Sequence, residues 1–188
     1  PIMKKWTSPV SLCVVLFSMF CTAQERTPNA ELKAIVTFMD PNKSIIVNTE
    51  TSERHTTLLT ALRATELDAI LDYDGQFTVF APSNDAFKAV DGKILSDVFK
   101  DKFLLATVMK LHIVPEKFDY ETLLNKIVAG GGTFSLKTLM GEKIKATLSG
   151  NQIILTDFNG TQVNVLNNKS ISTDDGVYYI IDKVMAIN

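Results

Sequence analysis

The chain of 188 residues is long enough for one folded domain, and its 46% hydrophobic and 21% charged residues are typical of a globular protein. Its 19 basic and 21 acidic side chains give a formal net charge of −2, and the basic residues form no cluster along the sequence. Nucleic acid is therefore not expected as a partner, because binding to a phosphate backbone depends on clustered lysine and arginine.

The N-terminal residues 1–23 have the three parts of a signal peptide. Lys4 and Lys5 supply positive charge, an apolar run follows from Val10 to Cys21, and small residues end at Ala23. A membrane-spanning helix needs about 20 apolar residues, which this run does not reach. We therefore expect a chain that does not span the membrane and is exported to the periplasm, the cell surface or the medium.

Both cysteines of the sequence fall in this N-terminal segment. A lipid anchor at Cys21 is a less favoured alternative, because Met19 and Phe20 are larger than the residues that normally precede an acylated cysteine. Cleavage after Ala23 would remove Cys13 and Cys21. The exported domain is thus expected to fold without disulfides and to have no thiol nucleophile or thiolate metal ligand.

The first half of the exported chain predicts mainly helices. Residues 24–41 are expected to form a polar spacer that includes a short helix over 31–39. Residues 57–71 carry leucine and isoleucine at helical spacing, which predicts one amphipathic helix. Residues 76–81 have apolar side chains on both faces and predict a strand that is buried on both sides.

Two polar residues are expected to begin further helices. Ser83 can cap a helix that continues to Val90, and Asp119 can cap a short helix over residues 120–127. Between them, residues 97–111 have two apolar lines at helical spacing and predict a third, longer helix.

The C-terminal part predicts strands. Residues 143–148 alternate apolar and polar side chains, as in a half-buried strand, and Asn159-Gly160 is a strong hairpin turn. Because helices come first and strands mostly later, the order favours an α+β fold over a doubly wound parallel sheet. The other expected strands are residues 152–156, 162–166 and 177–185.

The sequence contains no recognisable catalytic or metal-binding motif. His55 lies in a polar stretch and is expected to be solvated at a helix start, whereas His112 ends an apolar helix and is expected to make a structural hydrogen bond. Neither has a companion at metal-ligand spacing, so we expect no metal and no other cofactor. The chain is expected not to be an enzyme; the alternative is a hydrolase site built on His112 with a nearby Asp or Ser.

Five segments resemble the fasciclin domain, and the first of them, residues 57–71, resembles its first core helix. Residues 78–87 (TVFAPSNDAF) resemble its first signature box, and residues 111–118 (LHIVPEKF) resemble its central tyrosine–histidine segment. Residues 138–144 resemble its threonine–leucine–x–glycine turn, and residues 175–185 resemble its final strand. Order and spacing agree to the end of the chain, which predicts a fasciclin domain over residues 42–188.

The resemblance implies a β-wedge or sandwich flanked by helices, with a non-enzymatic role in binding and cell adhesion. The expected partner is an extracellular or envelope protein or glycan. Leu111 replaces the usual tyrosine and Ser170 replaces an aspartate of some animal members, so integrin recognition is not expected; the single-domain format resembles bacterial members. Candidate binding residues carried by the resemblance are Leu111, His112, Asn168, Lys169, Ser170 and Ile171.

A second hypothesis is a carrier of a small apolar ligand or lipid in the cell envelope. It requires a sizeable apolar pocket, whereas apolar side chains more often form a close-packed core. One domain cannot join two surfaces by itself, so adhesion would require self-association or a separate anchor. The sequence leaves the oligomeric state and the identity of the partner open.

Overall fold

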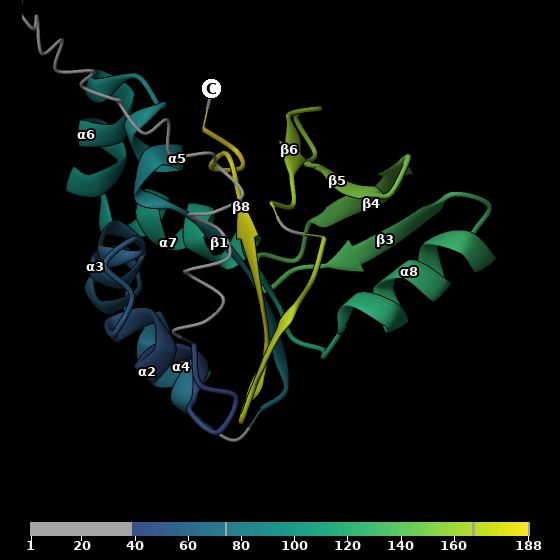
Figure 1. Cartoon of the computed structure of the whole chain (residues 1–188). Helices are drawn as coiled ribbons and strands as arrows, with labels where there is room; N and C mark the ends of the chain where they lie inside the picture. The colour runs from purple at the N-terminus through teal and green to yellow at the C-terminus, as the bar shows by residue number, and fades with distance from the viewer. Residues whose placement is uncertain (1–38, 74, 167, 188) are drawn as a thin grey trace, which may run out of the picture.

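The computed structural model describes residues 39–73, 75–166 and 168–187. The expected signal peptide, both cysteines and residues 31–38 of the expected first helix fall outside this part of the chain. A central sheet separates a group of helices from a second sheet (Figure 1). The architecture is α+β, as the order of the predicted elements indicated.

The central sheet has the strand order β2-β1-β8-β7. Strands β1 (Phe77–Pro82) and β8 (Gly176–Ile181) run parallel in its middle. The short strands β2 (Ile113–Val114) and β7 (Ile171–Thr173) pair antiparallel at its two edges. Both middle strands are buried along their whole length, which confirms the doubly buried strand predicted for residues 76–81.

Glycine is required where the two middle strands begin. Gly176 lies opposite Phe77 in the parallel register. A Cβ atom at Gly176 would stand 2.1 Å from the carbonyl oxygen of Phe77. The close approach of these backbones therefore depends on the missing side chain.

Helices cover one face of the central sheet, on the left in Figure 1. None of the helices in the described ranges is long and apolar enough to cross a lipid bilayer. The helices on this face are α2 (Ile45–Glu50), α3 (Thr56–Ala64), α4 (Leu67–Asp72), α5 (Asn84–Lys88), α6 (Gly92–Lys100) and α7 (Lys102–Leu111).

Two helices that the sequence predicted as continuous are each divided in the structure. The helix expected over residues 57–71 is interrupted by Glu66, whose φ of 61° lies in the left-handed region. The helix expected over residues 97–111 is interrupted at Asp101, whose carboxylate accepts the N–H groups of Phe103 and Leu104 at 2.9 and 3.0 Å. Apolar spacing continued through both breaks, so the pattern alone did not show them.

The second sheet is an antiparallel meander with the order β3-β4-β5-β6. Helix α8 (Tyr120–Ala129) precedes it and is capped by Asp119, whose carboxylate accepts the N–H of Thr122 at 2.7 Å, as predicted. The hairpin at Asn159-Gly160 is also confirmed, because it joins β5 to β6. The strands are β3 (Thr133–Lys137), β4 (Lys143–Ser149), β5 (Gln152–Thr156) and β6 (Gln162–Asn164).

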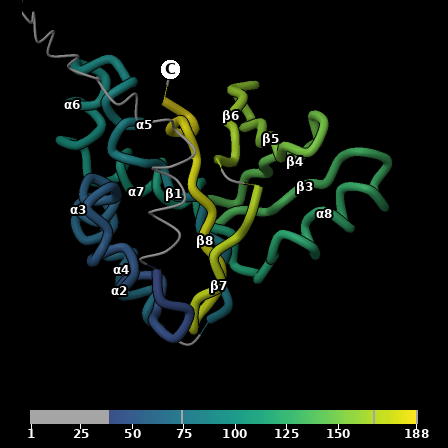
Figure 2. The backbone as a smooth tube through the Cα atoms, in the orientation of Figure 1, coloured from purple at the N-terminus to yellow at the C-terminus, as the bar shows by residue number. Residues whose placement is uncertain are grey.

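The central sheet divides the apolar interior into two cores. Tyr178 and Ile180 of β8 point into the first core, which lies between the sheet and helices α2 to α7. Tyr179 and Ile181 alternate with them and point into the second core, which is shared with α8 and the second sheet. The alternation is that of a strand covered on both faces. The tube in Figure 2 shows β8 running between these two halves of the molecule.

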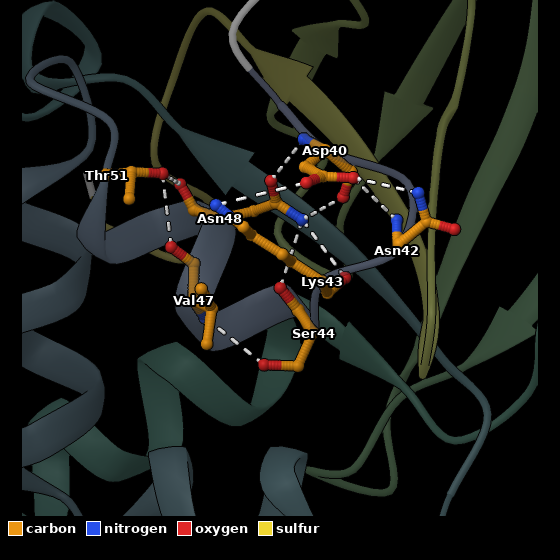
Figure 3. A network of polar contacts seen from close by, with 7 residues as sticks. All are labelled: Asp40, Asn42, Lys43, Ser44, Val47, Asn48 and Thr51. Atoms are coloured by element: carbon orange, nitrogen blue, oxygen red, sulfur yellow. Dashed lines mark hydrogen bonds and ion pairs between the residues drawn. The ribbon is translucent and has the colours of Figure 1, made fainter.

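Asn48 holds the first described residues against the helices (Figure 3). Its side chain is fully buried, and its Oδ1 accepts the N–H of Asp40 at 2.7 Å. Its Nδ2 donates to the carbonyl oxygens of Asp40, Lys43 and Ser44 at 2.9, 3.2 and 3.1 Å. Asp175, between β7 and β8, accepts the N–H of Ile45 at 2.8 Å. These bonds fix the entry of the chain to both α2 and the central sheet.

Candidate interaction surfaces

Leu111 and His112 lie at the end of α7, and both side chains are buried. Leu111 packs in the second core and is 0% exposed, and His112 is 1% exposed. The N–H of Met185 donates to Nε2 of His112 at 3.0 Å, so the ring proton belongs on Nδ1, which donates to the carbonyl oxygen of Val108 at 2.8 Å. The structural hydrogen bond expected for His112 is therefore confirmed. Neither side chain is available to a partner at the surface.

Burial keeps the imidazole of His112 neutral. Desolvation lowers the pKa of His112 to about 4, and the hydrogen bond to Val108 and the charge of Asp157 oppose this only partly. Both ring nitrogens already have partners within the fold. The ring therefore has no free nitrogen with which to act as a base, and the hydrolase alternative gains no support from it.

His55 is also buried, and the prediction that it is solvated is wrong. Its side chain is 0% exposed, and its ring meets that of Tyr178 edge-on with centroids 5.4 Å apart. The Oγ of Ser52 lies 2.8 Å from Nδ1. Burial and the nearby charge of Arg54 lower the pKa of His55 to about 4. The polar neighbours in sequence misled the prediction, because the segment before α3 turns back over β8.

Residues 168–171 lead into β7 at the edge of the central sheet. Ile171 is buried in the first core at 7% exposure, and the Oγ of Ser170 accepts the N–H of Tyr120 at 3.0 Å. Asn168 has a φ of 46°, a conformation that asparagine tolerates better than most residues. Lys169 is exposed. Buried Ile171 and bonded Ser170 thus hold a short loop on which Lys169 is presented to solvent.

The structure does not bring the two candidate segments together into one patch. Leu111 and His112 precede β2, and residues 168–170 precede β7, the strand at the opposite edge of the central sheet. Leu111 and Ile171 also belong to different cores.

The first signature box forms structure at the start of α5. The Oγ of Ser83 accepts the N–H of Ala86 at 3.2 Å, which confirms the predicted cap. Asn84 donates from Nδ2 to the carbonyl oxygen of Glu53 at 2.9 Å and accepts the N–H of Thr57 at 3.0 Å. The box therefore joins β1 and α5 to the segment that begins α3.

A shallow surface depression of about 270 Å³ lies beside this box. Its charges are balanced, and Lys88 pairs with Asp85 at 3.0 Å. Such a polar depression gives no support to the carrier of an apolar ligand. Its lining residues are Glu53, Arg54, Ser83, Asn84, Asp85 and Lys88. Within the described ranges, no group of three or more His, Cys, Asp or Glu side chains is placed to hold a metal ion.

The sequence did not reveal a basic surface on the second sheet. Lys137 of β3 lies directly opposite Lys143 of β4, and Ser135 lies opposite Lys145. All three lysines are exposed, whereas their strand neighbours Leu136, Ile144 and Ala146 are buried. The alternation of residues 143–148 was the available signal. It predicted exposed lysines on one strand but not the lysine of the neighbouring strand that joins them.

Comparisons with known proteins agree on one family. The family model described as the fasciclin domain matches residues 53–187, which lie inside the range of 42–188 predicted from the sequence. The fold is similar to that of a FAS1 domain pair from the insect cell adhesion molecule Fasciclin I, with a TM-score of 0.64, 13% identity and coverage of 77% of this chain and 51% of that one.

Sequence relatives include animal and cyanobacterial proteins. The chain is 31% identical over 153 residues to transforming growth factor-beta-induced protein ig-h3 of Sus scrofa and 32% identical over 146 residues to human periostin. These matches cover 81% and 76% of this chain but only 20% and 16% of the relatives. Protein sll1483 of Synechocystis is 26% identical over 136 residues, with 71% of this chain and 68% of that protein covered.

Proposed function

Because the chain belongs to the fasciclin domain family, we propose that it is a non-enzymatic, extracellular binding module that recognises a protein or glycan outside the cell and supports adhesion. The observation that carries the proposal is the family match over residues 53–187. It is supported by the similarity of the fold to a domain pair of a cell adhesion molecule. The chain matches one portion of its animal relatives, so the partners of those whole proteins are not transferred.

Recognition would use exposed loops, since the residues that carry the family pattern are mostly core. Leu111, His112 and Ile171 are buried and would contribute by holding the backbone in place. Lys169 is the exposed member of the candidate set. Its loop is fixed on the C-terminal side of Lys169 by the Ser170 bond to Tyr120 and by β7, which begins at Ile171. A loop held in this way loses little conformational freedom on binding.

The proposed location is outside the cell membrane, with residues 1–23 acting as a removable signal peptide and residues 42–188 as the domain. The family match over residues 53–187 is consistent with such a location. An attached or self-associating form would allow one domain to join two surfaces.

The proposal is tested by capture of a partner on the purified protein. The protein is coupled to beads, exposed to envelope and secreted fractions of the producing cells, and bound material is identified by mass spectrometry. We expect a saturable partner whose binding is weakened several-fold by Lys169→Ala, because this substitution removes an exposed charge from the candidate loop. Lys93→Ala, at an exposed lysine of α6, is the matched control and should have no effect.

Two outcomes would contradict the proposal. A folded protein that captures no saturable partner from either fraction would remove its basis. Equal weakening by Lys169→Ala and Lys93→Ala would show that the loop around Lys169 is not the binding surface.

A further inference from the structure

The outward side of the second sheet gathers lysines from two strands. Residues that pair directly in an antiparallel sheet point to the same side, so Lys137 and Lys143 lie next to each other. Lys145 follows Lys143 by two positions on the same side of β4. We call the surface formed by Lys137, Lys143 and Lys145 the lysine face.

Uncharged polar residues lie next to the lysine face on the same side of the sheet. Lys145 pairs with Ser135 on one side and with Thr156 on the other, and Thr156 pairs with Gln162 of β6. None of the outward positions on the four strands is acidic. These positions, which alternate with the buried ones, are Thr133, Ser135, Lys137, Lys143, Lys145, Thr147, Ser149, Gln152, Ile154, Thr156, Gln162 and Asn164.

The positive charges of the lysine face are not balanced by ion pairs within the described part of the chain. Elsewhere exposed lysines do pair, as Lys102 does with Glu66 at 2.6 Å. Glu142 is exposed in the turn between β3 and β4, next to Lys143 in the sequence. Asp182 lies at the other edge of the sheet, where it accepts two hydrogen bonds from Asn164 of β6 at 2.8 and 2.6 Å.

This arrangement carries an electrostatic cost in the free protein. Like charges placed directly across two strands, with Cβ atoms about 5 Å apart, destabilise a sheet. The lysine face also concentrates positive charge on a chain whose net charge is −2. An anionic ligand that spans Lys137, Lys143 and Lys145 would relieve the repulsion.

We propose that the lysine face binds a linear acidic polysaccharide, with sulfate or carboxylate groups on the lysines and sugar hydroxyls on the neighbouring Ser, Thr and Gln side chains. The outward positions of the four strands carry no aromatic side chain for stacking on nucleic-acid bases. Nor do they form the broad apolar face by which a protein enters a membrane interface. The lysine face lies on a different sheet from the Lys169 loop and is argued independently of it.

The test compares two triple variants of equal charge. Lys137→Gln, Lys143→Gln and Lys145→Gln neutralise the lysine face, and Lys88→Gln, Lys93→Gln and Lys117→Gln remove three exposed lysines elsewhere. Binding of heparin oligosaccharide, polygalacturonate and neutral dextran to the full chain is measured by titration calorimetry at about 0.15 M salt, where distant exposed charges are largely screened.

The wild type is expected to bind heparin or polygalacturonate but not dextran. The lysine-face variant should bind roughly tenfold more weakly or worse, because it loses all three adjacent charges, and the control variant should change by less than about twofold. Absence of binding to both acidic polymers, equal binding to dextran, or equal losses in the two variants would overturn the proposal. So would binding confined to vesicles containing phosphatidylglycerol, which would assign the surface to membranes instead.

Thermal unfolding distinguishes a binding role from a structural one. The lysine-face variant should melt at or above the wild-type temperature, because cross-strand repulsion is removed. The acidic polymer should raise the melting temperature of the wild type but not that of the variant, since only a bound ligand stabilises by mass action. A variant that melts several degrees lower would show that the lysines are structural and would overturn the proposal. The lysine-face variant should still capture the partner expected for the Lys169 loop as well as the wild type does. The two proposals can therefore fail separately.

Discussion

The imidazole Nε2 of His112 accepts a 3.0 Å hydrogen bond from the backbone N–H of Met185. This bond joins the end of α7 to the segment that follows β8, although the two residues are far apart in sequence. The carbonyl oxygen of His112 also accepts the N–H of Phe80 in β1 at 2.9 Å. His112 therefore bonds to β1 and to the segment after β8. His112 therefore ties three of the recognised family segments to one another.

Replacing His112 by alanine should destabilise the fold. His112→Ala removes a buried ring, leaves the Met185 N–H without an acceptor and opens a cavity, and together these should lower the free energy of unfolding by about 3 kcal/mol. Urea unfolding at neutral pH measures the change. Lys117→Ala is the exposed control and should change stability by less than about 0.5 kcal/mol. Wild-type stability of His112→Ala would contradict the role assigned to this bond.

The stability of the protein should fall in mild acid. The folded protein holds the pKa of His55 and of His112 at about 4, below the value of about 6.5 in an unfolded chain. As the pH falls, the unfolded chain therefore binds these protons before the folded protein does. The stability contributed by the two neutral rings is fully present above about pH 6.5 and is lost as the pH falls towards 4. Each histidine contributes on the order of 3 kcal/mol.

Urea unfolding at several pH values between about 7 and 4.5 measures this loss, which proton linkage predicts. The exposed carboxyl groups of Asp85 and Asp119, whose pKa values lie below the ordinary range, titrate below this interval. His55→Gln should reduce the slope of stability against pH to about half, whatever its effect on absolute stability. A flat profile in the wild type would contradict the neutral state of both buried rings.

Replacing the buried side chain of Asn48 should destabilise the fold clearly more than replacing an exposed asparagine. Asn48→Ala would remove the acceptor of the Asp40 N–H and the donor to three carbonyl oxygens, so it should cost about 2–3 kcal/mol of stability. Asn125→Ala, at an exposed position of α8, is the matched control. Differential scanning calorimetry compares the two, and similar melting temperatures would show that the network in Figure 3 does not stabilise the fold.

Loss of the cap on α5 should have a smaller effect. Ser83→Ala removes the acceptor of the Ala86 N–H and should lower stability by about 1 kcal/mol. Ser83→Asp keeps a capping oxygen and should recover part of this loss. Ser135→Ala, on the exposed side of β3, is the control. If all three variants unfold like the wild type, the cap does not contribute measurably.

The sequence predicted the buried middle strand, the caps at Ser83 and Asp119 and the hairpin at Asn159-Gly160, because each depends on local chemistry. It did not predict the breaks at Glu66 and Asp101. There the apolar spacing continues on both sides of the break. At Asp101 a local signal exists, because its carboxylate caps α7, but the continuous apolar pattern outweighed it.

Prediction of the interaction surfaces was limited for a different reason. His55 has polar neighbours in sequence but lies against Tyr178 in the fold, a contact that no local pattern contains. The lysine face likewise depends on the register that places Lys137 opposite Lys143. Sequence alternation indicates which side chains share a side of one strand, whereas pairing between strands follows from the folded sheet.

The most direct test of an extracellular adhesion module is a cell-attachment assay. Cells that lack the gene are compared with cells that carry the wild-type protein or the Lys169→Ala variant at equal abundance. We predict that attachment to a surface or to other cells decreases on deletion, is restored by the wild type and is not fully restored by the variant. Unchanged attachment after deletion, with the exported protein present in wild-type cells, would contradict the proposed function.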